Sequence, residues 1–354
     1  MTADLEPIER LEDHREAWSR LALAAGHPFA TWEWNTIWWR HFAAGRDLYS
    51  FVCRDESGEP AAILPLYLAA RRPVGVARFL GFADLQSPVC GDAGRDLAAA
   101  GLAAVTRRPH RARVLFAERM PAEQGWGERL GGSLLNRDDL PLLRFEGRSW
   151  EDLLATLNRK HRNTVRRKER RALEQGLSFR LADDPGRLGD DMRTLFRLHD
   201  ERWGAHGTGV FGGTGAEFHL ELAAAALEGG WLRLWIAEVD GEPAAAWYGF
   251  RFAGIEWHFQ GGRDRRFDSL SVGSVLWHHT ARAACEDGLE AYHFLAGTEP
   301  YKMHLASETA HAETRLCGSP AFAAPVAAAI KLRGRAIALA ERARRARPSP
   351  APSD

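Results

Sequence analysis

The chain has 354 residues, of which 45% are apolar and 27% are charged. This length exceeds the usual single hydrophobic core and favours two domains of roughly 150 to 200 residues each. Lysine and arginine number 47 and so do aspartate and glutamate, which gives a formal net charge of +0. This balance excludes a protein whose overall charge drives nucleic-acid binding, so we expect no DNA partner and only local basic patches.

The cysteines and the N-terminus indicate in which kind of compartment the protein is expected to occur. Cys53, Cys90, Cys285 and Cys317 are far apart and form no C-x-x-C pair, which argues against a zinc site or a redox motif. The first residues, MTADLEPIERLEDHRE, lack the basic-then-apolar order of a signal peptide. The alanine-rich runs are about half of the roughly 20 residues that a membrane span needs. We therefore expect a soluble, cytoplasmic protein in a reducing compartment.

The first 147 residues predict one α/β half. Helical spacing over 11–23 stops near Gly26, and Thr31 is a plausible N-cap for a second helix. In that helix Trp34, Trp38 and Phe42 fall four residues apart, which favours core packing over an aromatic binding site. Strands are expected at 48–54 and 61–68 as a hairpin, and at 78–82, 114–116 and 141–145, with a helix at 95–105.

The rest of the chain predicts a second half with a similar order of elements. The dipeptide Asp240-Gly241 between two apolar runs indicates a hairpin turn. Helices are expected at 150–175, 186–203, 216–227, 272–287 and 299–306, and strands at 177–181, 231–239, 244–252, 255–260, 289–295 and 313–316. Residues 331–347 read as a basic helix, and we expect the PSPAPSD end to be disordered.

The two halves share a short repeat. The sequence GEPAA occurs at 58–62 and again at 241–245, each time between two apolar strands. Because the surrounding order of helices and strands also agrees, we predict a duplicated α/β (α+β) unit. The expected domains are residues 1–147, on the acceptor side, residues 148–330, which carry the chemistry, and a tail of residues 331–354.

A loop between the strand at 255–260 and the following helix is suited to phosphate. It reads RDRRFDSLSVGS over 263–274. A helix N-terminus offers unpaired N–H groups, Gly273 permits close approach, and Ser271 and Ser274 add hydroxyls. Arg263 begins the loop and adds positive charge. The alternative, which residue types leave open, is an ordinary serine-capped helix beside a solvated basic loop.

A second cluster, GTEPYK over 297–302, ends the next strand, where ligand crevices open in α/β sheets. Glu299 could accept a proton through water, Tyr301 could return one, and Lys302 could pair with an anionic group. The alternative is a helix start with a surface lysine. His258 is a reserve base, and a period of two places it with Gln260 on one face of its strand.

A third candidate is the basic run NRKHRNTVRRKERR over 158–171. Its density of lysine and arginine attracts phosphates, RNA included. It lacks interleaved aromatic residues, so base stacking is not indicated. We interpret it as a solvated face that partly lines a groove for an anionic ligand, with Arg162 and Arg166 as substrate-binding candidates.

These stretches together resemble the GNAT acyltransferase superfamily, and specifically its two-domain CelD-like acetyltransferases. They are also distantly similar to the Fem-type peptidoglycan aminoacyl transferases. The residues that carry the resemblance are the basic run at 158, the hairpin with its third strand, the SVGSVL loop and FLAGTEPYK, over about residues 150–310. The family's usual Arg/Gln-x-x-Gly-x-Gly/Ala loop is reduced here to Ser-Val-Gly-Ser.

The resemblance implies tandem GNAT-like domains and an acyl-CoA donor, normally acetyl-CoA. The third strand of the second copy, around Gln260 and Gly261, would contact pantetheine, and Ser271, Gly273 and Ser274 would hold the pyrophosphate. Tyr301 falls where the superfamily often has its acid. The implied activity is N-acylation of a small amine or sugar amine. The alternatives are a Fem-like enzyme that uses aminoacyl-tRNA and a catalytically silent scaffold for polysaccharide assembly.

Overall fold

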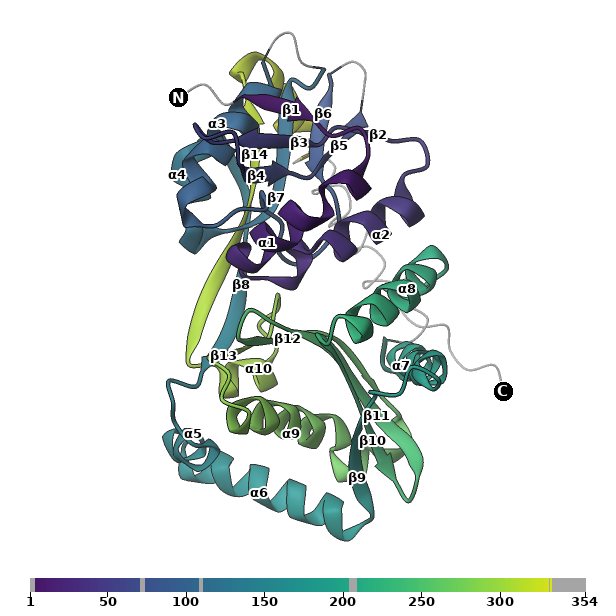
Figure 1. Ribbon diagram of the computed structural model, residues 1–354. Helices are drawn as coiled ribbons and strands as arrows, with labels where there is room; N and C mark the ends of the chain where they lie inside the picture. Colours follow the sequence, from purple (N-terminus) through teal and green to yellow (C-terminus); the bar gives the residue numbers. More distant parts are fainter. Residues whose placement is uncertain (1–3, 71–73, 108–110, 204–208, 331, 333–354) are drawn as a thin grey trace, which may run out of the picture.

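The computed structural model describes residues 4–70, 74–107, 111–203, 209–330 and 332. They form two α/β lobes, the first half of the chain above and the second below in Figure 1. One sheet of eleven strands runs through both lobes, and a sheet of three strands belongs to the first. The predicted α/β class, with helices packed on a mixed sheet in each half, is confirmed.

The first half follows the predicted order, with its strands divided differently. Pro65 separates β4 from β5, because proline cannot donate to a strand ladder, and the chain passes there from one sheet to the other. The elements are β1 (Leu5–Pro7), α1 (Arg15–Ala25), α2 (Trp32–Phe42), β2 (Asp47–Leu48), β3 (Phe51–Arg54), β4 (Pro60–Leu64), β5 (Leu66–Ala70), β6 (Val76–Phe79), α3 (Arg95–Val105), β7 (Val114–Pro121), α4 (Trp126–Leu130) and β8 (Ser133–Arg144).

The second half differs from the prediction at its first helix, which is two helices. Leu157 is extended and the side chain of Asn158 accepts a hydrogen bond from His161 N (2.8 Å), so a new helix starts there. The elements are α5 (Trp150–Thr156), α6 (Arg159–Glu174), β9 (Leu177–Leu181), α7 (Leu188–Trp203), α8 (Thr214–Glu228), β10 (Leu232–Val239), β11 (Glu242–Phe252), β12 (Ile255–Arg263), α9 (Val272–Glu286), β13 (Ala291–His293), α10 (Pro300–Leu305) and β14 (Glu308–Gly318). A last described helix covers 320–330, and the predicted basic tail, Leu332 apart, lies outside the described residues.

The halves exchange their last strands. β8, which ends the first half, pairs with β13 of the second, while β14, which ends the second half, pairs with β7 of the first. β8 and β14 also pair with each other, and Figure 1 shows them running together between the lobes. Each is far longer than the strands expected at 141–145 and 313–316. The division of the chain at residue 147 stays a prediction, because the sheet is continuous across it.

The two halves share the hairpin and the parallel strand pair that follows it. The GEPAA repeats both lie at hairpins, β3–β4 and β10–β11. In each half a parallel strand pair follows, with one helix between its strands: β6 and β7 around α3, and β12 and β13 around α9. At the second hairpin Asp240 and Gly241 have φ of 50° and 81°, the conformation that a two-residue turn requires.

The aromatic face of α2 packs into the core, as predicted, on partners from both halves, and Trp34 meets Phe29 of its own half at 4.8 Å. The Trp34 ring meets Phe218 of α8, Phe250 of β11 and Phe259 of β12 edge to face, with centroids 5.4 to 5.9 Å apart. Edge-to-face pairs of this kind add stability beyond the area that they bury. Trp34 therefore belongs to a core that the two halves share.

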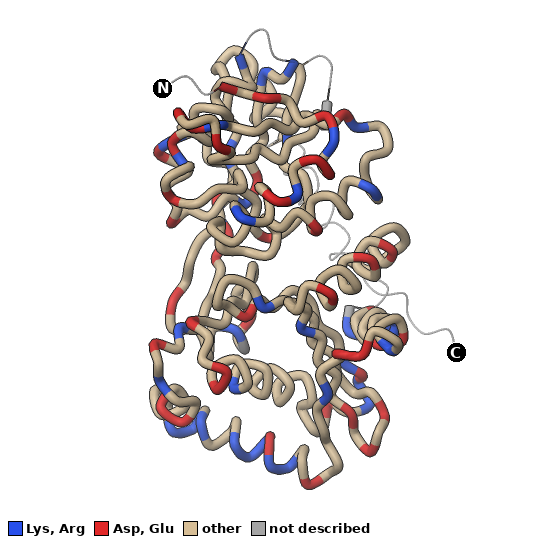
Figure 2. Tube along the Cα trace, in the orientation of Figure 1, with Lys and Arg blue, Asp and Glu red and all other residues tan. Residues whose placement is uncertain are grey.

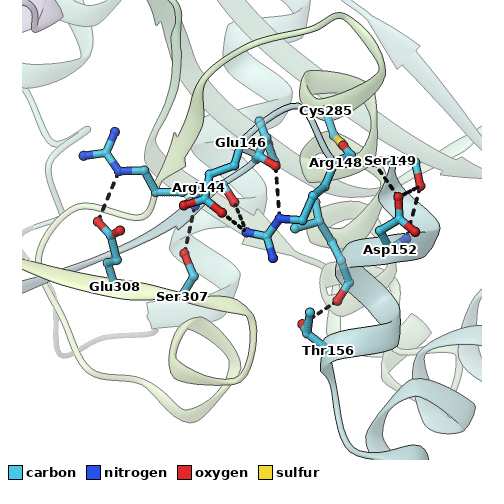
Figure 3. A network of polar contacts seen from close by, with 11 residues as sticks. Arg144, Glu146, Arg148, Ser149, Asp152, Thr156, Cys285, Ser307 and Glu308 are labelled. Atoms are coloured by element: carbon cyan, nitrogen blue, oxygen red, sulfur yellow. Dashed lines mark hydrogen bonds and ion pairs between the residues drawn. The ribbon is translucent and has the colours of Figure 1, made fainter.

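A polar network secures the chain where it enters the second half (Figure 3). Arg148 pairs with Glu146 (2.9 Å) and its Nη2 donates to the carbonyl of Arg144 (3.1 Å) at the end of β8. The Cys285 thiol of α9 donates to the carbonyl of Arg148 (3.3 Å). Ser149 and Asp152 cap α5 reciprocally. These contacts hold α5 and α9 to the end of β8.

Two findings concern the cysteines and the possibility of a membrane span. All four cysteines are buried and free. In the described ranges, no helix has the length and apolar character needed to cross a membrane.

Candidate active site

A cavity of about 400 Å³ opens between β12 and the start of α9. Strands β12 and β13 pair only up to Trp257 and His293, and beyond these residues the two strands diverge. Five of the predicted cofactor residues line the cavity: Gly261, Arg263, Ser271, Gly273 and Ser274. The remaining lining residues are Lys168, Arg202, Ala246, Gly262, Asp268, Leu276 and Trp277.

The N-terminus of α9 is open toward this cavity. Among the described side chains none caps the helix, so the alternative of an ordinary serine-capped helix is wrong. Ser271 precedes it in the left-handed conformation, with φ of 56°, which is unfavourable for a residue other than glycine. The first N–H groups of a helix have no partner within it, so Val272, Gly273 and Ser274 can offer theirs to an anion.

The loop arginines have separate roles. Arg263 lines the cavity and its Nε donates to Asp268 Oδ1 (2.7 Å). Arg266 is held away by Asp264 (2.8 Å) and Glu242, and the hydrogen bond from Arg266 lowers the pKa of Asp264. Arg265 donates to the carbonyl of Arg202 (3.5 Å). Only the first of the three therefore contributes its charge to the cavity wall.

Two cations on the cavity wall were missed by the sequence reasoning. Lys168 reaches it from α6 and Arg202 from the end of α7, where Nη1 donates to the carbonyl of Gly261 (3.3 Å). Lys168 lies three residues after Val165 and four before Ala172, which are the buried residues of α6. Helical periodicity therefore held the signal for Lys168, since these positions share one face.

A β-bulge changes the faces of β12. His258 pairs with Gly249, but Gln260 pairs with Tyr248, so Phe259 is the extra residue. His258 packs on Trp277 of α9, whereas Gln260 hydrogen-bonds His199 of α7 on the opposite face. The expectation that His258 and Gln260 share a face is therefore wrong, because strict alternation is lost at the bulge.

His258 lies behind the cavity wall, where its ring packs on Trp277. Its side chain is buried, and Nε2 has no hydrogen-bond partner among the described residues. Burial, helped by the charges of Lys302 and Arg202, holds the pKa of His258 well below its usual value, so the ring is neutral at neutral pH. A Cβ added to Gly261 would lie 3.5 Å from Nε2, so the glycine leaves open the space that faces this nitrogen.

The cluster at the end of β13 is assembled around a buried lysine. Lys302 is only 4% exposed, so the surface-lysine alternative is wrong. Its Nζ donates to the carbonyl of Ala296 (2.6 Å) and lies 3.1 Å from Glu299 Oε2. Glu299 is half-buried at the start of α10. The side chain of Tyr301 lies outside the described residues, so its role as the acid stays a prediction.

The two arginines predicted to bind substrate instead join α6 to α5. Arg162 Nη1 donates to the carbonyls of Ala155 (3.2 Å) and Leu157 (3.3 Å), and Arg166 pairs with Glu151. Neither lines the cavity. The exposed side of α6 still carries a row of positive charge, visible in Figure 2 along the lower edge of the molecule. Within the described ranges no cluster of acidic, histidine or cysteine side chains could hold a metal ion.

The start of α3 in the first half is more closely packed than the start of α9. Val89 exchanges two backbone hydrogen bonds with Ile63 (2.8 and 3.0 Å), much as Gly262 pairs with Ala246 in the second half. Only residues 90–94 then separate Val89 from α3, whereas residues 263–271 separate Gly262 from α9. A Cβ on Gly94 would clash with the carbonyl of Ala61, so the start of α3 packs directly on β4.

Residues 159–303 match the family model described as an acetyltransferase (GNAT) domain. The match runs from α6 to α10 and contains every residue of the cavity wall. This segment is a GNAT domain. The predicted resemblance to GNAT acyltransferases is therefore confirmed over this segment. A search of curated proteins found no match.

Solved structures share the fold of the GNAT domain together with the first half. FemX superposes with a TM-score of 0.61 at 12% identity, covering 87% of this chain and 95% of that one. The C-terminal domain (DUF2156) of a putative lysylphosphatidylglycerol synthetase from Agrobacterium fabrum gives 0.60 at 13% identity, covering 91% and 95%. L-PGS from Bacillus licheniformis gives 0.56 at 13% identity, covering 92% and 96%. These likenesses show the common two-lobed fold alone.

Proposed function

We propose that the protein is an N-acyltransferase that uses acyl-CoA, normally acetyl-CoA, as donor and a small amine or sugar amine as acceptor. The observation that carries the proposal is the cavity at the start of α9, where a helix end without a side-chain cap meets Lys168, Arg202 and Arg263. A helix N-terminus surrounded by cations is a site for a phosphate-bearing ligand.

The residues present fit such a ligand. Gly273 allows the backbone to approach it, since even a Cβ there would meet only the flexible side chain of Arg263 (3.3 Å). The hydroxyls of Ser271 and Ser274 lie on the same wall. Next to the lining residue Gly261, the unpartnered Nε2 of His258 is a buried polar atom that a ligand would satisfy. Acyl-CoA, when bound, supplies the acyl group as a thioester.

Acyl transfer needs a base and an acid on this chain. In the reaction the acceptor nitrogen forms a bond to the carbonyl carbon, the carbon–sulfur bond breaks, and the thiolate takes up a proton. We assign the removal of the amine proton to His258 or Glu299, and the return of a proton to Tyr301. His258 is neutral and therefore able to accept, while Glu299 is oriented by Lys302. Holding both reactants together would supply much of the acceleration.

Calorimetric titration with CoA and acetyl-CoA tests the donor site. We expect binding to the wild type, and roughly tenfold weaker binding to Lys168→Gln, because a hydrogen bond to a charged group is worth about 1.5–3 kcal/mol. Lys160→Gln is the matched control, since Lys160 lies on the exposed side of the same helix. Absence of CoA binding to the wild type would refute the proposal, and mass spectrometry of retained ligand would then identify what the site holds.

Variants at the proposed catalytic residues separate the roles. With any active amine pool, Tyr301→Phe should lower the rate without abolishing CoA binding, and an unchanged rate would remove the acid assignment. His258→Gln and Glu299→Gln distinguish the two bases, because only loss of the true base lowers the rate at saturating substrate. Turnover itself excludes the silent-scaffold alternative.

One observation favours a second candidate, transfer from aminoacyl-tRNA. Arg159, Lys160, Arg167 and Arg171 are exposed on α6 and form no ion pair within the described part of the chain. A row of unpaired cations on one helix attracts a phosphate backbone. This candidate predicts tRNA binding that weakens steeply with salt and is reduced in Arg167→Glu. Binding of CoA without tRNA binding would eliminate it.

A further inference from the structure

Trp277 occupies the space between the two diverging strands of the GNAT domain. It lies one turn after Gly273 on α9, is 7% exposed and forms part of the cavity wall. Its ring is 4.0 Å from the ring of His258, centroid to centroid, and stacks on Phe294 at 5.5 Å with an interplanar angle of 16°.

These two neighbours mark the point of divergence. His258 directly follows the last β12 residue that pairs with β13, and Phe294 directly follows the last residue of β13. The indole therefore lies in the opening that the strands create as they part. A ligand that occupies the cavity contacts this ring, because Trp277 is one of the lining residues.

The surroundings hold the indole in place. Tyr292 and Phe294, both fully buried, lie next to it on the side of β13, and Trp247, also fully buried, packs on His258. Packing of this kind resists the insertion of further groups, because extra methylenes in a filled core force side chains out of their rotamers. The ring cannot move inward without displacing these neighbours.

We propose that Trp277 is the residue that sets the length of the acyl group, by closing the inner end of the donor site to all but short chains. This inference rests on the proposed acyl-CoA donor. An acetyl group adds one methyl beyond the thioester carbonyl, whereas a longer chain needs the volume that the indole fills. Replacement of the indole by a smaller side chain opens that volume to additional methylene groups.

The test measures affinity for CoA, acetyl-CoA, butanoyl-CoA and hexanoyl-CoA by calorimetry, in the wild type, Trp277→Leu and Trp277→Phe. In the wild type, affinity should fall from acetyl-CoA to hexanoyl-CoA. In Trp277→Leu the order should reverse, with up to about fourfold tighter binding for each methylene that the new space buries. Trp277→Phe should lie between the two, and it keeps an aromatic ring in case the leucine variant folds poorly.

Trp235→Leu is the matched control. Trp235 is a half-buried tryptophan of β10 that packs edge to face on His279, outside the cavity wall. It should retain the wild-type order of affinities. Two results would overturn the inference: equal affinity of the wild type for acetyl-CoA and hexanoyl-CoA, or an unchanged order in both Trp277 variants that still bind CoA. Failure of the wild type to bind CoA itself would instead refute the donor site.

Discussion

Acidification should destabilise the protein, because several buried histidines are neutral in the folded state. Burial lowers the pKa of His27 and His278 to about 4, and of His219 and His293 to about 3. His219 packs on Trp34, and so lies in the aromatic contact between the halves. When the protein unfolds at acidic pH, these four rings become exposed and bind protons.

The direction in which stability changes with pH follows from how many protons the folded and unfolded states bind. Above the unfolded pKa of about 6.5, neither state is protonated at these rings and the burial carries no penalty. Below it, the unfolded chain takes up protons that the folded chain refuses until pH falls to about 3 or 4. At pH 5.5 each ring then favours unfolding by on the order of 1 kcal/mol, and the four together by several kcal/mol. A typical domain has only about 5–15 kcal/mol.

Urea unfolding followed by tryptophan fluorescence at pH 7.5 and pH 5.5 measures this loss. His219→Phe keeps an aromatic ring but removes one titrating group, so its loss of stability between the two pH values should be smaller by about 1 kcal/mol. Phe259→Leu is the control, because Phe259 adjoins His219 and does not titrate; it should lower stability equally at both pH values. Equal stability of the wild type at pH 7.5 and pH 5.5 would refute the reasoning.

Three further predictions concern the proposed donor site and the packing of β12 on α7 next to it. Gly262→Ala should lower the free energy of unfolding by about 1–3 kcal/mol, since its Cβ would overlap the backbone of α7 at His199; an unchanged urea midpoint would contradict that packing. Ser271→Gly should raise the melting temperature, because glycine relieves about 1 kcal/mol of left-handed strain, while CoA binding weakens through loss of the hydroxyl. Calorimetry should give one CoA per chain, and a stoichiometry of two would show that the first half also binds.

Much of the fold was predictable because its signals are local. The helix at 95–105 and the strand at 177–181 were predicted to the residue, since each has strong periodicity and clear ends. The hairpin at Asp240-Gly241 depends on two residues that tolerate positive φ. The same local chemistry predicted the open helix start at Gly273, which requires only a loop and a helix N-terminus.

What escaped prediction depends on partners distant in the chain. Arg162 and Lys168 look alike in the basic run, yet the first bonds to α5 and the second lines the cavity, because only the packing of α6 on α9 decides which face turns inward. The bulge at Phe259, which turns Gln260 away from His258, is visible only in the register of β12 against β11. No residue type signals it.

Local signals were enough to predict most helices and strands, the repeat of GEPAA and a phosphate-suited loop in the second half. The exchange of β8 and β14, the position of Trp277 between His258 and Phe294, and the burial of Lys302 beside Glu299 appear only in the folded chain. The two groups of features differ in the distance along the chain over which they are stabilised. Helix caps and turns are stabilised within a few residues, whereas strand exchange and the closing of a cavity are stabilised by contacts between segments that the sequence does not pair.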